Sequence, residues 1–170
     1  MDEHRSGCPI NLTLEVLGDR WSLIVIRDIM FGNRRHYLDL LEHSEEGIAS
    51  NILADRLSRL VSLGLLTRAS NPAHKQKAIY SLTEASIELV PILSEMMAWG
   101  RKHIQGTKLK GHGTLLEKGG KPMWKAFAAE LKAIHLGAPP PGRWIFFEPQ
   151  GTLLPAAGRR HKTKQQRRLS

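Results

Sequence analysis

The sequence predicts a mainly α-helical protein with one small β-hairpin in a chain of 170 residues. Two observations support this fold class. Apolar residues recur at three- and four-residue steps in residues 10–31, 49–62 and 84–105, which is the period of an amphipathic helix. Between the last two segments, a glycine precedes two short extended stretches that frame a polar loop, which is typical of a hairpin.

Residues 10–31 predict two short helices. Their apolar residues stand at helical steps, namely Ile10, Leu14, Leu17, Trp21 and Ile24. Gly18 interrupts the pattern, and Asp19 is a residue type that caps the N-terminus of a helix. We therefore expect the two helices to meet at Gly18. Next along the chain we expect a turn at residues 32–35, a third helix at 37–42 and a turn at 44–47.

Residues 49–62 predict a helix with one apolar and one polar face. At about 100° per residue, one arc holds Ala49, Leu53, Leu57, Leu60 and Val61. The opposite arc holds Asn51, Asp55, Ser58, Arg59 and Ser62. Gly64 then supplies the left-handed residue that ends many helices. We expect the leucine side to face the core.

The hairpin is predicted from residues 65–82. Residues 65–68 and 78–82 are expected to be its two strands, and residues 69–77 a long, polar and basic tip. Thr83 is then a plausible cap for a long helix that continues to residue 105. Pro91 is expected to kink this helix or to mark its first straight turn.

The long helix is apolar on more than one face. Its apolar residues are Ile87, Leu89, Val90, Leu93, Met96, Met97, Trp99 and Ile104. A helix with so wide an apolar arc is buried on two sides. In a chain of this length, we expect the second side to contact a partner subunit.

The composition changes after residue 106. Residues 106–120 are rich in glycine and lysine and predict a linker, residues 121–137 predict an amphipathic helix, and residues 144–147 are a candidate short strand. Trp144, Phe146 and Phe147 either cover an exposed patch or line a contact with the partner subunit or another protein, and the sequence does not decide between these roles. The expected domains are a winged-helix unit with dimerisation helices at 8–106, an extension with one amphipathic helix at 107–158, and a disordered basic tail at 159–170.

The order of elements is that of a winged helix-turn-helix. Three short helices precede the helix at 49–62, and a hairpin follows it, so this helix is expected to lie in a DNA major groove. Ser50, Asn51 and Arg59 are candidates for base or phosphate contact, whereas Arg56 lies nearer the core and has an ion pair as its alternative role. The candidates for phosphate contact around the helix are Arg34, Arg35, Arg68, Lys75 and Lys77.

The charge also favours a polyanionic partner. The chain has a formal charge of +9 and a pI of about 10.1. The last twelve residues hold six of the 25 Lys and Arg and no acid, so residues 1–158 carry 19 basic and 16 acidic residues, or +3. One cysteine excludes an intramolecular disulfide, and no apolar leader or membrane span is visible, so we expect a cytoplasmic protein.

Three segments resemble the HxlR-type transcriptional regulators. They are residues 8–29, which begin Cys-Pro and contain Leu-Gly-x-x-Trp; residues 47–68, with Gly-Ile-x-x-x-x-Leu; and residues 80–103, with Trp-Gly near the end. The resemblance runs from residue 8 to 104 and implies a dimeric winged-helix protein that binds DNA and regulates nearby genes. It places recognition on residues 49–62 and dimer contacts on the first helix and on residues 83–104.

Cys8 is a candidate redox sensor. The resemblance suggests this role, because several such regulators sense electrophiles or oxidants through a cysteine at this position. A helix start beside Pro9 can also lower the pKa of the thiol. The alternative is a small apolar residue near the dimer interface. With one cysteine in the chain, only a small-molecule adduct or a bond to Cys8 of the partner subunit is available.

The predicted function is that of a sequence-specific, dimeric DNA-binding regulator. We expect a repressor that responds to a small-molecule or redox signal and binds a pseudo-palindromic operator with half-sites about 10 bp apart or a multiple of it. The alternative is a winged-helix module that binds protein or RNA without operator specificity. No motif predicts an enzyme, a cofactor or a metal site.

Overall fold

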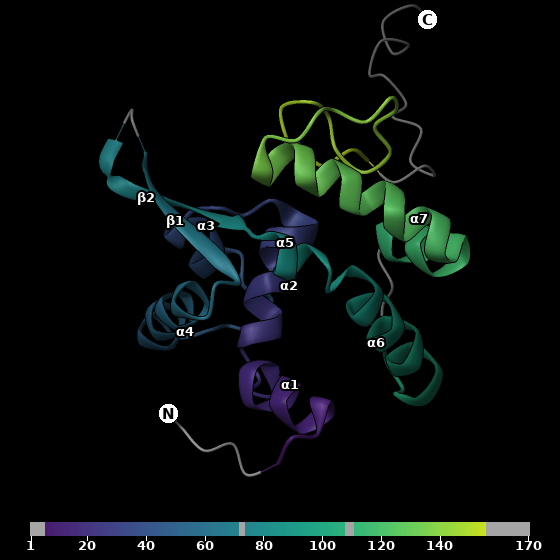
Figure 1. Ribbon diagram of the computed structural model, residues 1–170, viewed down its shortest axis with the longest axis horizontal. Coiled ribbons are helices and arrows are strands. Elements are labelled where there is room, and N and C mark those ends of the chain that lie inside the picture. Colours follow the sequence, from purple (N-terminus) through teal and green to yellow (C-terminus); the bar gives the residue numbers. More distant parts are fainter. Residues whose placement is uncertain (1–5, 72–73, 108–110, 156–170) are drawn as a thin grey trace, which may run out of the picture.

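The computed structural model describes residues 6–71, 74–107 and 111–155, with the backbone alone at residues 71, 74–77 and 111. The elements in chain order are α1 (Pro9–Leu17), α2 (Ser22–Gly32), α3 (Tyr37–Glu42), α4 (Ser50–Ser62), β1 (Leu66–Asn71), β2 (His74–Leu82), α5 (Glu84–Ile87), α6 (Val90–His103) and α7 (Gly111–Leu136). The described part of the chain is therefore mainly helical with one antiparallel hairpin, as predicted. In Figure 1, α2 lies at the centre, with α4 and the hairpin on one side and α6 and α7 on the other.

The junction between α1 and α2 is fixed by Asp19. Its Oδ1 accepts hydrogen bonds from the backbone N–H groups of Trp21 (2.9 Å) and Ser22 (3.0 Å). These N–H groups belong to the N-cap residue, Trp21, and to the first residue of α2, and have no partner within the helix. The prediction that two helices meet near Gly18 is confirmed, and Asp19 bonds to the start of α2 from a position before its N-cap.

The core joins the leucine side of α4 to α2. Leu53, Leu57 and Leu60 are buried, and so are Ile26 and Ile29 of α2. The exposed residues of α4 lie opposite, at helical spacing. Ala49 departs from the predicted apolar arc, because it is the exposed residue before the first turn and does not enter the core.

The hairpin is longer than predicted. β1 and β2 pair in register from Leu66 opposite Leu82 to Ser70 opposite Ala78, with an irregularity before Asn71. The expected loop at residues 69–77 is therefore wrong, because most of it belongs to the strands. A two-stranded ribbon that projects from the body needs no apolar alternation along its outer half, so that half carries no signal in the sequence.

The predicted long helix is two helices. Thr83 caps α5 through a capping box with Ser86, and Leu89 separates α5 from α6. Pro91 stands in the first turn of α6, where its missing N–H has no helical acceptor to satisfy. Pro91 thus marks a helix start, which was one of the two expected roles.

The expected linker at residues 106–120 is wrong. The helix α7 begins at Gly111 and continues to Leu136, with one non-helical residue, Gly120, at φ 54° and ψ −146°. Its first half buries Leu116 and its second half buries Phe127 and Leu131. Glycine and lysine resemble a linker in composition, yet here most of the segment belongs to a helix whose Leu116 packs inward and whose Lys118 is exposed.

The segment after α7 folds back onto it. Phe146 and Phe147 are fully buried, with ring centroids 4.5 and 6.0 Å from that of Phe127. The expected strand at residues 144–147 is reduced to a single bridge between Phe147 and Leu153. The two phenylalanines therefore complete the protein's own core. Of the roles left open by the sequence, covering an apolar patch of the chain itself is the one that the structure contains for them.

A buried carboxylate holds this segment. Glu130 of α7 is fully buried and accepts hydrogen bonds from the backbone N–H groups of Ile145 (2.5 Å), Phe146 (3.0 Å) and Phe147 (2.8 Å). These bonds replace the ladder that a second strand would have supplied.

The basic tail at 159–170 lies outside the described residues. Within the described part, no helix has the length and apolar content to span a membrane.

Candidate nucleic-acid interface

The outer face of α4 is polar and unpacked. Its exposed residues are Ser50, Asn51, Ala54, Asp55, Ser58 and Ser62. Small side chains at successive turns leave room for a groove wall to approach the helix. Tyr37 fixes the start of this face, because its hydroxyl donates a 2.9 Å hydrogen bond to the carbonyl of Ser50. Two of the predicted contacts, Ser50 and Asn51, therefore lie at the exposed N-terminal end of α4.

The two arginines of α4 turn toward the protein. Arg59 Nη2 donates a 2.7 Å hydrogen bond to the carbonyl of Glu15 in α1. Arg56 Nε lies 3.5 Å from Asp19 Oδ1. Because Asp19 also caps α2, these arginines tie the recognition helix to α1 and α2. The ion-pair alternative for Arg56 is the one that the structure contains, and DNA contact by either arginine stays a prediction.

The turn before α3 uses its arginines internally as well. Arg35 hydrogen-bonds to the carbonyl of Tyr80 (3.3 Å) and to the hydroxyl of Ser81, so it joins this turn to β2. Burial lowers the pKa of the Arg35 guanidinium, which stays charged. Arg34 Nη1 donates to the carbonyl of His43 (2.7 Å). The structure thus gives both arginines intramolecular partners that sequence spacing does not reveal.

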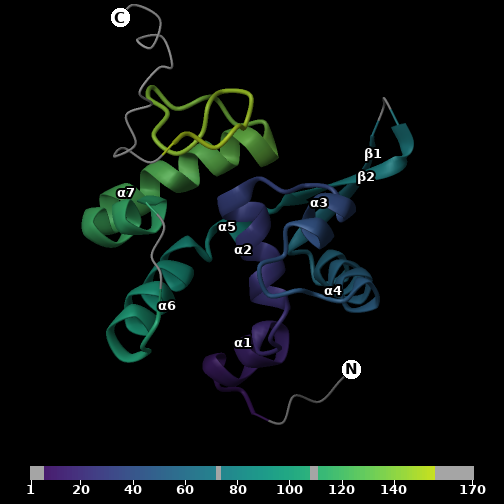
Figure 2. The ribbon, with the colours of Figure 1, turned by 180° about the vertical axis from the view of Figure 1, so that it is seen from behind.

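The remaining basic candidates lie on the wing. Arg68 is exposed on β1, opposite Tyr80 of β2. Lys75 and Lys77 belong to β2, in the half of the hairpin that projects from the body. Figures 1 and 2 both show the hairpin extending away from the helices on the side where α4 lies. A duplex placed along α4 would therefore meet the wing at its edge.

Cys8 is exposed at the N-terminal end of α1. Hydrogen bonding from the backbone N–H groups of Asn11 and Ile10 lowers the pKa of its thiol, which favours the reactive thiolate. Among the described residues, no three His, Cys, Asp or Glu side chains gather to hold a metal ion.

Exposed apolar side chains stand on α1 and on α6 with the residue that follows it, and the two sets together are here called the apolar stripe. It comprises Ile10, Leu14, Ile92, Met96, Trp99 and Ile104. Ile10 is 72% exposed and Trp99 61%. Large exposed apolar side chains on two helices are typical of a surface that another protein covers. These are the elements on which the sequence resemblance placed dimer contacts.

Sequence reasoning missed the residues that position α4. Tyr37, Glu15 and Asp19 act through one hydroxyl, one backbone carbonyl and one carboxylate. Asp19 could be recognised as a cap, but its reach to Arg56 depends on how α4 packs against the junction. The contacts of Tyr37 and Glu15 leave no periodic signal.

The fold and this face define a winged helix-turn-helix protein. The helix-turn-helix is followed by a two-stranded wing, and the polar side of α4 is open beside it. The model of the HxlR-like helix-turn-helix family matches residues 16–108. The chain belongs to this family, whose members are transcriptional regulators and not enzymes.

Bacterial relatives have similar sequences over about three fifths of the chain. The HTH-type transcriptional regulator MT3179 of Mycobacterium tuberculosis is 34% identical over 102 residues, which cover 59% of this chain and 63% of the relative. The regulatory protein MalR of Fusobacterium mortiferum is 30% identical over 101 residues, which cover 59% of this chain and 94% of MalR. The chain thus spans less than two thirds of the length of MT3179.

One solved structure extends the likeness beyond the family segment. The crystal structure of PA1607, described as a transcription factor, superposes with a TM-score of 0.55 at 23% identity. The superposition covers 92% of this chain and 94% of PA1607. This likeness concerns the fold, and it includes residues of the extension that the family model leaves out.

Proposed function

We propose that this protein is a homodimeric regulator that binds a pseudo-palindromic DNA operator through α4 and represses transcription. One observation carries the proposal: the outer face of α4 is exposed and polar, while the inner face is fully packed. Family membership supports DNA as the partner, because the matched segment contains the whole helix-turn-helix.

We assign different contacts with DNA to the side chains of α4 and of the wing. Asn51 and Ser50 are short and exposed, so they suit contact with base edges or phosphates near the start of α4. The exposed face itself holds one acid, Asp55, which pairs with Arg56. Arg56 also pairs with Asp19, and Arg59 bonds to the carbonyl of Glu15, so both arginines of α4 have partners within the protein. We therefore assign the phosphate contacts mainly to Arg68, Lys75 and Lys77 of the wing.

The dimer would form through the apolar stripe. Because α1 is bonded to α4 through Arg59, a dimer built on α1 and α6 would fix the distance between the two recognition helices. We expect sedimentation to show a dimer, and Trp99→Glu to shift it to monomer while the circular dichroism stays unchanged. Lys125→Glu, at an exposed position of α7, is the matched control. A monomeric unmodified protein would remove two-fold recognition from the proposal.

Footprinting tests the proposed DNA partner. The purified protein is incubated with DNA from around its own gene, in the presence of excess non-specific duplex. We expect a protected region with two-fold symmetry and half-sites about one helical turn apart. Protection that the competitor abolishes would instead favour the module that binds protein or RNA.

Cys8 is the proposed redox input. An oxidant would convert the thiolate to a sulfenic acid, which a second thiol, such as Cys8 of the partner subunit, would condense into a disulfide with loss of water. Since Cys8 begins α1, such a bond would pull on the dimer helices. We expect peroxide to release operator DNA from the unmodified protein and not from Cys8→Ser. An equal response of the two proteins would exclude Cys8 as the sensor.

A further inference from the structure

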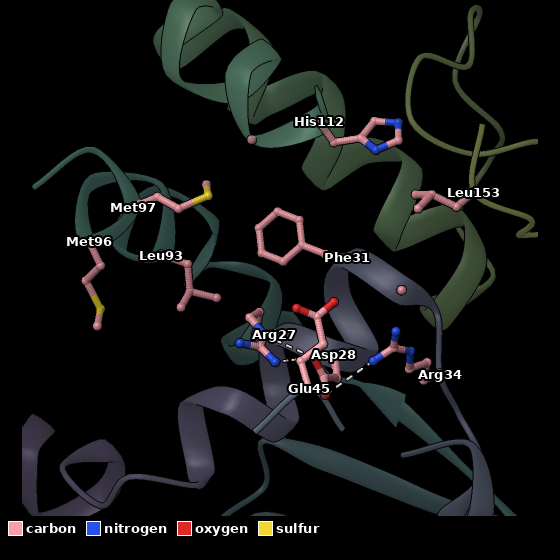
Figure 3. Close-up of a pocket in the computed structure, with 12 residues that line it drawn as sticks. Arg27, Asp28, Phe31, Arg34, Glu45, Leu93, Met96, Met97, His112 and Leu153 are labelled. Carbon is pink, nitrogen blue, oxygen red and sulfur yellow. Dashed lines mark hydrogen bonds and ion pairs between the residues drawn. The ribbon is translucent and has the colours of Figure 1, made fainter. Parts of the chain in front are cut away.

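A cleft lies between α2, α6 and the first half of α7. Its volume is about 600 Å³, within the range of small-molecule sites. Its apolar lining comes from Phe31, Leu93, Met96, Met97 and Leu153. Figure 3 shows these side chains around one space, with the polar residues of α2 on one side and His112 on the other.

The cleft depends on the extension. His112 and Leu153 lie beyond residue 108, where the family match ends, and they form the wall opposite α2 and α6. The segment that carries Leu153 is held against α7 by Glu130 and by the Phe147–Leu153 bridge. This wall is therefore a firm part of the fold.

The apolar lining suits an aromatic ring. Phe31 stacks on Phe127 with ring centroids 5.2 Å apart, which fixes the Phe31 ring from behind. Met96 and Met97 add flexible side chains with polarisable sulfur atoms, which make favourable contacts with aromatic rings. A planar, aromatic molecule would thus lie between a rigid wall, formed by Phe31, and an adaptable wall, formed by Met96 and Met97.

The polar lining offers a guanidinium with spare donors. Arg34 uses Nη1 for the carbonyl of His43, and this atom lies 3.6 Å from Asp28 Oδ2. Within the described residues, its Nε and Nη2 have no hydrogen-bond partner. Arg27 differs, because Glu46 and Asp28 occupy its guanidinium at 2.6–2.9 Å. Asp28 is buried and already bonded to Arg27. The unbonded N–H groups of Arg34 are therefore the groups that can bind the polar end of a ligand.

We propose that this cleft binds a small aromatic carboxylic acid, with its ring between Phe31 and the methionines and its carboxylate on Arg34. Glu45 also lines the cleft, so the lining holds two acids, Asp28 and Glu45. An aromatic cation is therefore the competing class of ligand, and the test must distinguish it from the acid.

The position of the cleft gives it a regulatory consequence that rests on the proposed function. Met96 belongs both to the cleft and to the apolar stripe. A ligand that fits one position of α6 better than another would shift the dimer toward that arrangement. Binding of the acid itself requires neither the dimer nor DNA.

Calorimetry on the full chain tests the site. Naphthoate, naphthalenemethanol and naphthylmethylamine share one ring system and differ in charge. We expect one naphthoate per chain, bound at least tenfold more tightly than the alcohol or the amine. A charge-assisted hydrogen bond contributes roughly tenfold or more, so Arg34→Gln should remove most of the preference for acid over alcohol.

Two variants that fill the cleft locate the binding. Met97→Trp and Leu153→Trp should each weaken naphthoate binding at least tenfold, and Lys125→Trp should not. Leu153 is 40% exposed, so its replacement preserves the test if Met97→Trp does not fold. The proposal is overturned by no binding at millimolar concentration, by unchanged affinity in both filled variants, by a preference for the amine, or by no effect of Arg34→Gln. Because the assay contains no DNA, failure here leaves the footprinting result independent.

Discussion

The winged-helix part, residues 6–107, and the extension, residues 111–155, are built by different means. In the winged-helix part, apolar residues at helical spacing bury one side of a helix and leave the other open, as in α4, whose leucine side packs against α2. In the extension, one kinked helix is followed by an irregular segment that a single buried carboxylate holds in place. A core can therefore be completed by side-chain to backbone bonds where no second strand or helix is available.

The aromatic cluster joins the two parts. Phe127 of α7 stacks on Phe31 of α2 and contacts Phe146 from the irregular segment. Asn33 at the end of α2 donates a 2.9 Å hydrogen bond to the carbonyl of Gly151. The extension is therefore packed against the element at the centre of the winged helix, and the two parts are expected to unfold together.

The largest expected effect is at Glu130. Replacing it with alanine leaves three buried backbone N–H groups without acceptors, and we expect a decrease of roughly 4 kcal/mol in the free energy of unfolding. Urea denaturation measures this decrease. Glu130→Gln keeps one acceptor oxygen and should be less destabilised. A decrease below about 1 kcal/mol for the alanine variant would show that the buried carboxylate does not hold the segment, and the contrast between the two parts would fail.

The sequence predicts the winged-helix part much better than the extension. The helix at residues 37–42 and the end of α4 at Gly64 (φ 70°) are confirmed, because periodicity and turn glycines are local signals. Glu130 gives no such signal, since an acid on an amphipathic helix normally faces solvent. The linker prediction was wrong because glycine content alone does not show that the neighbouring leucines are buried.

The same limit applies to the candidate interface. The exposed side of α4, with Ser50 and Asn51, follows from its periodicity. The directions of Arg35, Arg56 and Arg59 do not, because a long side chain bonds to whatever carbonyl or carboxylate the tertiary fold places within reach. Short residues on a periodic face are thus easier to assign from sequence than long charged residues near its border.

The contact between the winged-helix part and the extension at His135 predicts that the free energy of unfolding depends on pH. His135 of α7 accepts a 3.3 Å hydrogen bond at Nδ1 from the backbone N–H of Leu82 in β2. Burial, aided by the charge of Arg35, lowers the pKa of His135 to about 3. Between pH 6.5 and 3 the unfolded chain therefore binds a proton that the folded chain does not, so stability is greatest above pH 6.5 and falls with pH.

The size of this effect is set by the difference between the two pKa values. At about 1.4 kcal/mol per pH unit, lowering the pH from 7 to 5 should remove roughly 2 kcal/mol of unfolding free energy. Denaturation of the unmodified protein and of His135→Gln, compared at both pH values, isolates this contribution from that of the carboxylates. Equal pH dependence in the two proteins would show that His135 can be protonated in the folded protein and that the extension is loosely attached there.

On the winged-helix side, Asn51→Ala tests the open face of α4. We expect affinity for the footprinted operator to fall tenfold to about a hundredfold, because one base or phosphate contact is removed from each subunit. Electrophoretic mobility shift measures it. Ser62→Ala, near the other end of the same face, is the matched control and should change affinity little. Equal, small effects of both substitutions would take Asn51 out of the recognition surface.

The smallest expected effect concerns the wing, and it separates phosphate contact from base contact. Replacing both Lys75 and Lys77 with glutamine should lower the slope of log K against log salt by about 0.9 for each phosphate that is no longer neutralised, with little change in the preference for operator over other DNA. Lys121→Gln with Lys125→Gln removes the same charge from the exposed side of α7, in the extension, and should leave the slope unchanged. If both pairs lowered the slope equally, net charge would explain the binding, and the winged-helix part would hold no phosphate site that the extension lacks.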